Sequence, residues 1–118
     1  MAKTLALVLG VVLLAVGVVG WFTGGHDHTL LNLFGINMTH NIVHLLTGAV
    51  GLVAALNSEK SSKLFLLVFG AVYAVVALAG FLNVDMAVSM LNLNTADNIL
   101  HLAIAAACLG VGLQSKAA

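Results

Sequence analysis

Four long apolar stretches separated by short polar segments dominate the pattern of the chain. The first runs from Thr4 to Phe22 without a charged residue, and comparable stretches cover residues 39–58, 64–82 and 98–114. At about 1.5 Å of rise per residue, a helix of this length spans about 28 Å, close to the hydrocarbon thickness of a bilayer. The pattern therefore predicts an all-α membrane protein with four transmembrane helices.

The segments between these stretches are shorter and more polar. Residues 30–36 are apolar but too few to cross a membrane, so we expect them at the interface or folded back over the bundle. Asn37 or Thr39 is a candidate N-cap, because a short polar side chain can accept from the first free N–H groups of a helix. Residues 59–63 are charged and predict a cytoplasmic linker, whereas residues 84–93 predict a second outer loop.

A polar motif occurs twice in one register. Asn37, Asn41 and His44 return 57 positions later as Asn94, Asn98 and His101. Because an even number of spans separates equivalent positions, we expect two tandem parallel-oriented helical hairpins, related by a pseudo-two-fold axis along the membrane normal. Residues 1–58 form the first hairpin and residues 64–118 the second, within one compact membrane domain.

Composition and charge support a bilayer location. Of the 118 residues, 62% are hydrophobic and 7% are charged, and the formal net charge is zero. Such a surface needs a lipid bilayer, and it offers no basic patch for nucleic acid. The lysines that fall on one side of a four-span topology are Lys3, Lys60, Lys63 and Lys116. By the positive-inside rule, they predict cytoplasmic N and C termini in a bacterial inner, or thylakoid-type, membrane.

The sequence lacks the motifs of common enzymes. It contains no Ser/His/Asp order, paired carboxylates, phosphate loop or HExxH run, so we expect no catalytic activity. No charged residue lies in the middle of a span, which argues against transport of protons or ions. By elimination, the chain is predicted to be an accessory or scaffold subunit of a larger bacterial membrane complex. Its expected partners are lipid and either other membrane subunits or further copies of itself.

His44 and His101 are predicted to lie about one turn inside the second and fourth long helices. An ionisable group is costly in lipid, so both should face the bundle. In one interpretation, these imidazoles bond to loop carbonyls or to an opposing Asn and hold the outer loops over the bundle, and Asn41 and Asn98 hold the helix starts in the same way. In a second, His44 and His101 are axial ligands of haem b or of chlorophyll, oriented by carbonyls or by Asn41 and Asn98.

A third interpretation is a zinc or copper site at the outer surface. Its candidate ligands are His26, His28, His40 and His44. The last two are four residues apart, on one face of a helix, and imidazole suits both metals. The second copy argues against this site, because Asp97 stands at the position equivalent to His40.

The motif also resembles a known family. Residues 40–48 (HNIVHLLTG) and 97–102 (DNILHL) are similar to a family of small bacterial four-span membrane proteins, catalogued as a domain of unknown function. The resemblance covers nearly the whole chain. It implies the four-span fold and the importance of Asn41, His44, Asn98 and His101, but it implies no activity.

Overall fold

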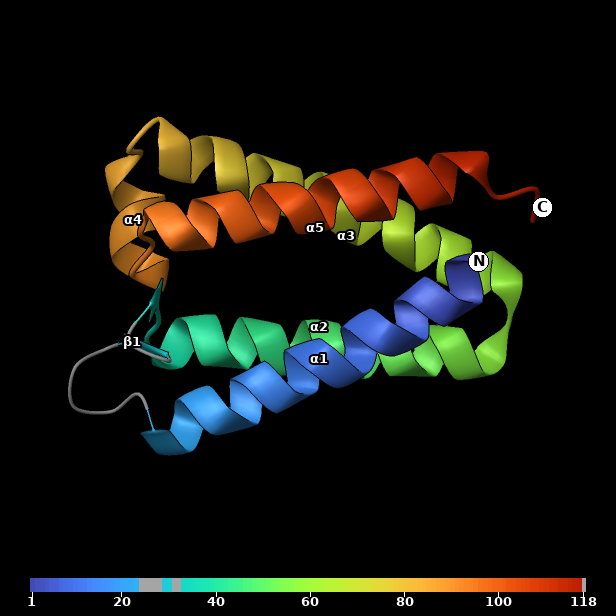
Figure 1. Ribbon diagram of the computed structural model, residues 1–118, viewed down its shortest axis with the longest axis horizontal. Helices are drawn as coiled ribbons and strands as arrows, with labels where there is room; N and C mark the ends of the chain where they lie inside the picture. The colour runs from blue at the N-terminus through green and yellow to red at the C-terminus, as the bar shows by residue number, and fades with distance from the viewer. Residues whose placement is uncertain (24–28, 31–32, 118) are drawn as a thin grey trace.

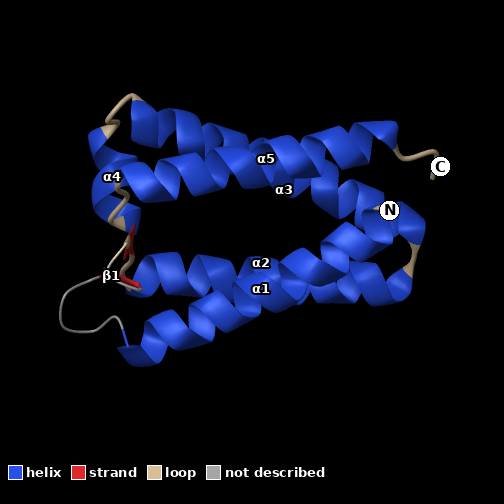
Figure 2. Cartoon of the chain, viewed as in Figure 1, coloured by secondary structure: helices blue, strands red, loops and turns tan. Residues whose placement is uncertain are grey.

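Four long helices and one short helix make up most of the protein. The computed structural model describes the chain except residues 24–28, 31–32 and 118. The elements are α1 (Ala2–Thr23), β1 (Thr29–Leu30), β2 (Phe34–Gly35), α2 (Met38–Asn57), α3 (Glu59–Phe81), α4 (Asp85–Leu91) and α5 (Thr95–Gln114) (Figure 1, Figure 2). The four long helices are each long and apolar enough to cross a membrane. This confirms the prediction of an all-α membrane protein with four candidate spans.

The long helices pack as two pairs. α1 lies along α2, α3 lies along α5, and the two pairs lie side by side (Figure 1). Both chain termini and the junction between α2 and α3 lie at one end of the bundle, which we call the terminal end. α4 and the two strands lie at the opposite end, the loop end.

The junction between α2 and α3 is shorter than the sequence predicts. Residues 59–63, expected as a linker, instead open α3, and Ser58 alone separates the two helices. The Ser58 hydroxyl accepts a hydrogen bond from Ser61 N at 3.0 Å. This N-cap and the acidic Glu59 in the first turn both stabilise a helix start, so the charged segment is helical.

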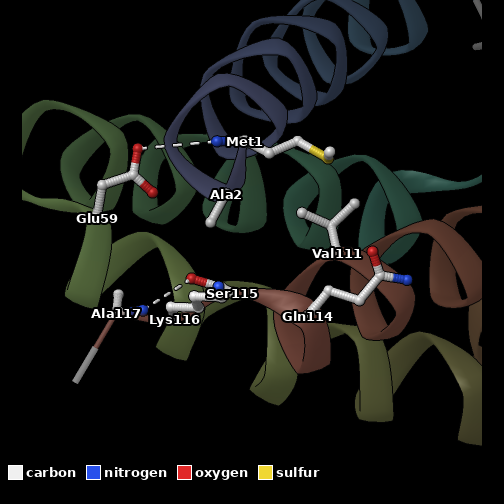
Figure 3. A pocket seen from close by; sticks show the side chains of 8 residues that line it. All are labelled: Met1, Ala2, Glu59, Val111, Gln114, Ser115, Lys116 and Ala117. Atoms are coloured by element: carbon white, nitrogen blue, oxygen red, sulfur yellow. Dashed lines mark hydrogen bonds and ion pairs between the residues drawn. The ribbon is translucent and has the colours of Figure 1, made fainter.

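Polar contacts join the elements at the terminal end. The Met1 amino group lies 4.0 Å from Glu59 Oε1 (Figure 3), and Lys63 Nζ donates to Ser115 O at 2.7 Å. The Met1 pair is exposed, so it contributes little to stability. The Lys63 bond ties the start of α3 to the residue that follows α5. A pocket of about 370 Å³ lies here, lined by Met1, Ala2, Glu59, Val111, Gln114, Ser115, Lys116 and Ala117.

The described part of the apolar segment 30–36, Leu30 and residues 33–36, folds back over the bundle, one of the two predicted arrangements. β1 pairs with β2 in antiparallel register, and Leu30 and Ile36 are only 5% and 1% exposed. The predicted loop 84–93 contains a helix, α4, that the sequence pattern missed. α4 is followed by its C-cap Asn92, which has a positive φ of 51°, a conformation that Asn adopts more readily than most residues.

Glycines bring α1 and α2 into backbone contact. A Cβ on Gly48 would lie 2.7 Å from Leu14 N and 2.8 Å from Gly10 O. In the other pair, the position equivalent to Gly48 is Ala105, which is 2% exposed. Because apolar side chains gain nothing by leaving lipid tails for protein, membrane helices depend on such close approach for their mutual packing.

We expect Gly48→Ala to lower the free energy of unfolding by about 1 to 3 kcal/mol, because the added methyl group meets fixed backbone atoms. Gly110→Ala is the matched control, since nothing lies within 4 Å of a Cβ there. Because alanine has a higher helix propensity than glycine, this control should leave the free energy of unfolding unchanged or raise it by up to about 1 kcal/mol. Unfolding of the detergent-purified variants, followed by circular dichroism, measures both changes. Equal losses of stability in the two variants would contradict the packing argument.

Candidate functional site

Two equivalent asparagines begin the helices that carry the polar motif. The Asn37 side chain accepts from His40 N at 2.8 Å, and the Asn94 side chain accepts from Asp97 N at 2.9 Å. Asp97 Oδ2 also accepts from Asn94 N at 3.0 Å, which completes a capping box. Asn37 is therefore the N-cap of α2, as one of the two sequence candidates predicted.

The amide groups of these asparagines also connect the two halves of the chain. Asn37 Nδ2 donates to Met90 O at 2.8 Å, and Asn94 Nδ2 donates to Leu33 O at 2.9 Å. Leu33 and Met90 are themselves 57 positions apart, so the two bonds are equivalent by the sequence repeat. We call this reciprocal pair, formed by Asn37 and Asn94, the amide clamp.

Two further hydrogen bonds cross the loop end. Asn92 Nδ2 donates to Ile36 O at 2.9 Å, and His40 Nδ1 lies 2.9 Å from Leu91 O. All four bonds join a side chain of one half to a backbone carbonyl of the other, two in each direction. The segment around β2 and the segment at the end of α4 are thus held against each other.

These contacts differ from those that the sequence indicates. The sequence predicts loop contacts for His44 and His101, and contacts at the helix starts for Asn41 and Asn98. None of the four bonds involves these residues, so their contacts stay a prediction, and the bonds that hold the loop end come from other side chains. The sequence identifies Asn37 only as a helix cap, because capping depends on residues of the same helix. The bond from its amide group to Met90 O depends on the tertiary fold, which the sequence pattern does not give.

Three histidines meet beneath the clamp. His40, His44 and His101 are 1%, 5% and 3% exposed. The ring centroid of His40 lies 4.4 Å from that of His44 and 5.4 Å from that of His101, and the remaining pair is 6.2 Å apart. One ring nitrogen from each lies within 4.8 Å of the other two. The prediction that His44 and His101 face the bundle is confirmed.

The hydrogen bond of His40 fixes its tautomer. A carbonyl oxygen can only accept, so Nδ1 of His40 carries the proton donated to Leu91 O and Nε2 keeps a lone pair. Three ring nitrogens are buried without a hydrogen-bond partner among the residues that the structure describes: His40 Nε2, His44 Nδ1 and His101 Nδ1. Each unsatisfied buried polar atom costs about 1 to 3 kcal/mol, so this cluster is costly as packing alone.

Asn41 and Asn98 lie against the partner helix of their own pair. A side chain on Gly20 would meet the Asn41 carboxamide, and one on Gly80 would meet that of Asn98. The Oδ1 atoms of both asparagines are buried, and neither has a hydrogen-bond partner within the described ranges. Both glycines therefore leave room for a buried amide, and the described contacts place neither amide among the ring nitrogens.

A small cavity lies beside two of the histidines. It measures about 90 Å³ and is lined by His44, His101, Asp97, Val16, Leu30, Phe34, Ile36 and Leu100. A buried water needs roughly 10 to 15 Å³ of such space, so several waters or a small anion fit. Pockets for larger organic ligands measure about 300 to 1,000 Å³, so the cavity has no room for a haem or chlorophyll ring.

The structure tests the outer-surface metal interpretation in part. His40 and His44 do come together, as their spacing predicts, whereas His26 and His28 lie outside the described residues. Sequence reasoning missed that His101 joins His40, because the equivalent of His40 is an aspartate and the two residues were assigned to different sites. Tyr73 of α3 lies beside this cluster, with its ring centroid 5.4 Å from that of His101.

Together, the fold and the site define a small polytopic membrane protein with a buried polar cluster at its loop end. The chain belongs to the family described as Domain of unknown function (DUF4383), which matches residues 3–114. The resemblance noted from the sequence is thus confirmed over most of the chain. No curated protein and no solved structure matches it.

We expect Asn37→Ala and Asn94→Ala each to lower the free energy of unfolding by about 2 kcal/mol. Each loses a helix cap, worth about 1 kcal/mol, and a hydrogen bond between halves, worth about 0.5 to 1.5 kcal/mol. Asn57→Ala is the control, because Asn57 is exposed and its side chain donates to nearby Ser61 at the terminal end, away from the clamp. Its effect should stay within about 0.5 kcal/mol. Denaturant titration in detergent compares the three variants, and equal effects would contradict the clamp.

Proposed function

We propose that the chain is a non-catalytic integral membrane protein that acts as a scaffold or accessory subunit of a larger bacterial membrane complex. The amide clamp of Asn37 and Asn94 carries this proposal, because hydrogen bonds in both directions favour a bundle that stays closed. In the described part of the long helices, charged side chains lie only near helix ends, as Lys63 and Asp97 do. Transport of charge needs ionisable groups deeper in the membrane, so a structural role fits better.

The proposed orientation places the terminal end in the cytoplasm. The lysines belong to helix starts and ends at that side of the bundle, and they are Lys3, Lys60, Lys63 and Lys116. Short flanks rich in Lys remain cytoplasmic. The loop end then faces outward from a bacterial inner membrane, and the two hairpins are related by a pseudo-two-fold axis along the membrane normal.

One outward face of the bundle suits a neighbouring membrane helix. On α5, the side chains of Ala103, Ala106 and Ala107 are exposed, and nothing lies within 4 Å of a Cβ built on Gly110. Small residues on a lipid-facing helix let another helix approach closely. Apart from Ala49, the exposed residues of α2 are larger, as Val53 and Leu56 illustrate. We therefore place the contact with a partner subunit on α5.

Tetrapyrrole binding through His44 and His101 is the alternative function. The cavity of about 90 Å³ beside these rings does not favour it. The ring of His40, whose centroid lies 4.4 Å from that of His44, also occupies space that a macrocycle would need. A colourless protein is therefore expected.

A photo-crosslinking amino acid at Ala106 should give one defined crosslinked species in native membranes. The same group at Val53, which is 69% exposed on α2, is the matched control and should give none. Immunoblotting of the tagged chain after illumination detects the products. The subunit proposal fails if neither position crosslinks and the protein also migrates as an isolated bundle in native gels.

Cysteine labelling in whole cells should report the proposed orientation. In a Cys108→Ser background, Ser89→Cys places a thiol on exposed α4 at the loop end, and Asn57→Cys places one at the terminal end. A membrane-impermeant maleimide should label Ser89→Cys in intact cells and Asn57→Cys only after permeabilisation. The reverse pattern would overturn the proposed topology.

A further inference from the structure

We propose that His40, His44 and His101 form a binding site for a single first-row transition-metal ion, with zinc as the best-matched ion. The rings come from two helices of different halves, α2 and α5, and all three are more than nine-tenths buried. Three imidazoles suit zinc, copper and nickel ions far better than magnesium or calcium, which prefer oxygen ligands.

The donor atoms of the site are available for coordination. Each ring has a buried nitrogen without a hydrogen-bond partner in the described part of the chain: His40 Nε2, His44 Nδ1 and His101 Nδ1. In His40, the bond from Nδ1 to Leu91 O at 2.9 Å holds the ring and leaves the Nε2 lone pair free. Metal-bound histidines usually make such an outer bond, because it fixes both the tautomer and the ring orientation.

The spacing of the ring nitrogens is close to that of a metal site. A zinc ion with bonds of about 2.0 to 2.1 Å holds its ligand nitrogens roughly 3.4 Å apart in tetrahedral geometry. One ring nitrogen of each histidine lies within 4.8 Å of the other two. The proposed site therefore requires small rotations of these side chains to bring the three nitrogens to metal-binding distance.

The surroundings supply a fourth position and a compensating charge. The cavity of about 90 Å³ reaches His44 and His101 and has room for a water or small anion as fourth ligand. Asp97 lines the same cavity, at the position equivalent to His40. Its carboxylate offsets part of the charge that a divalent ion brings into an apolar bundle, where an uncompensated charge is costly.

The site differs from the surface cluster considered from the sequence. It needs neither His26 nor His28, and it takes its third ligand from the second half of the chain, at His101. It also differs from tetrapyrrole ligation, because the three rings converge on one point rather than standing on opposite faces of a macrocycle.

Zinc titration of the intact, detergent-purified protein tests the proposal. After chelator treatment, the wild-type chain should bind one Zn²⁺ in competition with a chromogenic chelator. His44→Ala and His101→Ala should each weaken binding at least about 100-fold, the upper range for loss of an outer-shell partner. Nδ1 of each of these two rings has no hydrogen-bond partner among the described residues, so both variants are expected to fold even if His40→Ala does not. Bound Zn²⁺ should also raise the unfolding temperature of the wild type but not of these two variants.

Two control variants show where the ion binds. Cys108→Ser removes the free buried thiol of α5, seven residues beyond His101, and should leave zinc affinity unchanged. His26→Ala with His28→Ala should also leave it unchanged. The proposal is overturned if the stripped wild type binds neither Zn²⁺, Cu²⁺ nor Ni²⁺, if the triad variants bind normally, or if only the His26 and His28 variant loses binding. A Soret band from protein of native membranes that is lost in His44→Ala would overturn it in favour of haem.

Discussion

Polar groups enclosed among apolar helices need partners of their own, because neither lipid nor a leucine side chain can supply a hydrogen bond. At the loop end, four backbone carbonyls accept bonds from side chains of the opposite half, and they belong to Leu33, Ile36, Met90 and Leu91. These bonds close the top of a bundle whose outward surface is apolar. The closed loop end also covers the histidines, since the rings that meet beneath it are at most 5% exposed.

The repeat and its exceptions have different physical roles. Where contacts hold the structure together, equivalent residues make equivalent contacts. Asn37 and Asn94 are both N-caps and both bond to the opposite half. Gly20 and Gly80 likewise both lie against a buried amide, that of Asn41 and that of Asn98. The exception lies at His40 and Asp97. Here one half contributes an imidazole to the cluster, and the other contributes a carboxylate that caps its own helix and borders the cavity. The histidine cluster is therefore asymmetric, although the contacts that hold the two halves together follow the sequence repeat.

Hydropathy was sufficient to predict the four spans, because a bilayer imposes a length and a composition on each helix. The inward position of His44 and His101 also followed from the cost of exposing an imidazole to lipid. The start of α3 was missed because Glu59 and its charged neighbours suggest a loop, whereas the Ser58 cap makes them helical. Periodicity gives the face of a helix on which His40 lies. It does not say that a residue 61 positions away, His101, faces it from another helix.

The amide clamp has a consequence for how such a chain could have arisen. Its two bonds join equivalent positions, so a pair of identical single hairpins lying parallel in the membrane could form both of them as a homodimer. In such a homodimer both copies would carry the same residue at each position. The positions of His40 and Asp97 would then hold either two histidines or two aspartates. Once the two hairpins are fused into one polypeptide, the two positions can hold different residues. Gene duplication would then be what allowed a bundle held by symmetric bonds to carry three imidazoles and one carboxylate at a single unsymmetrical centre.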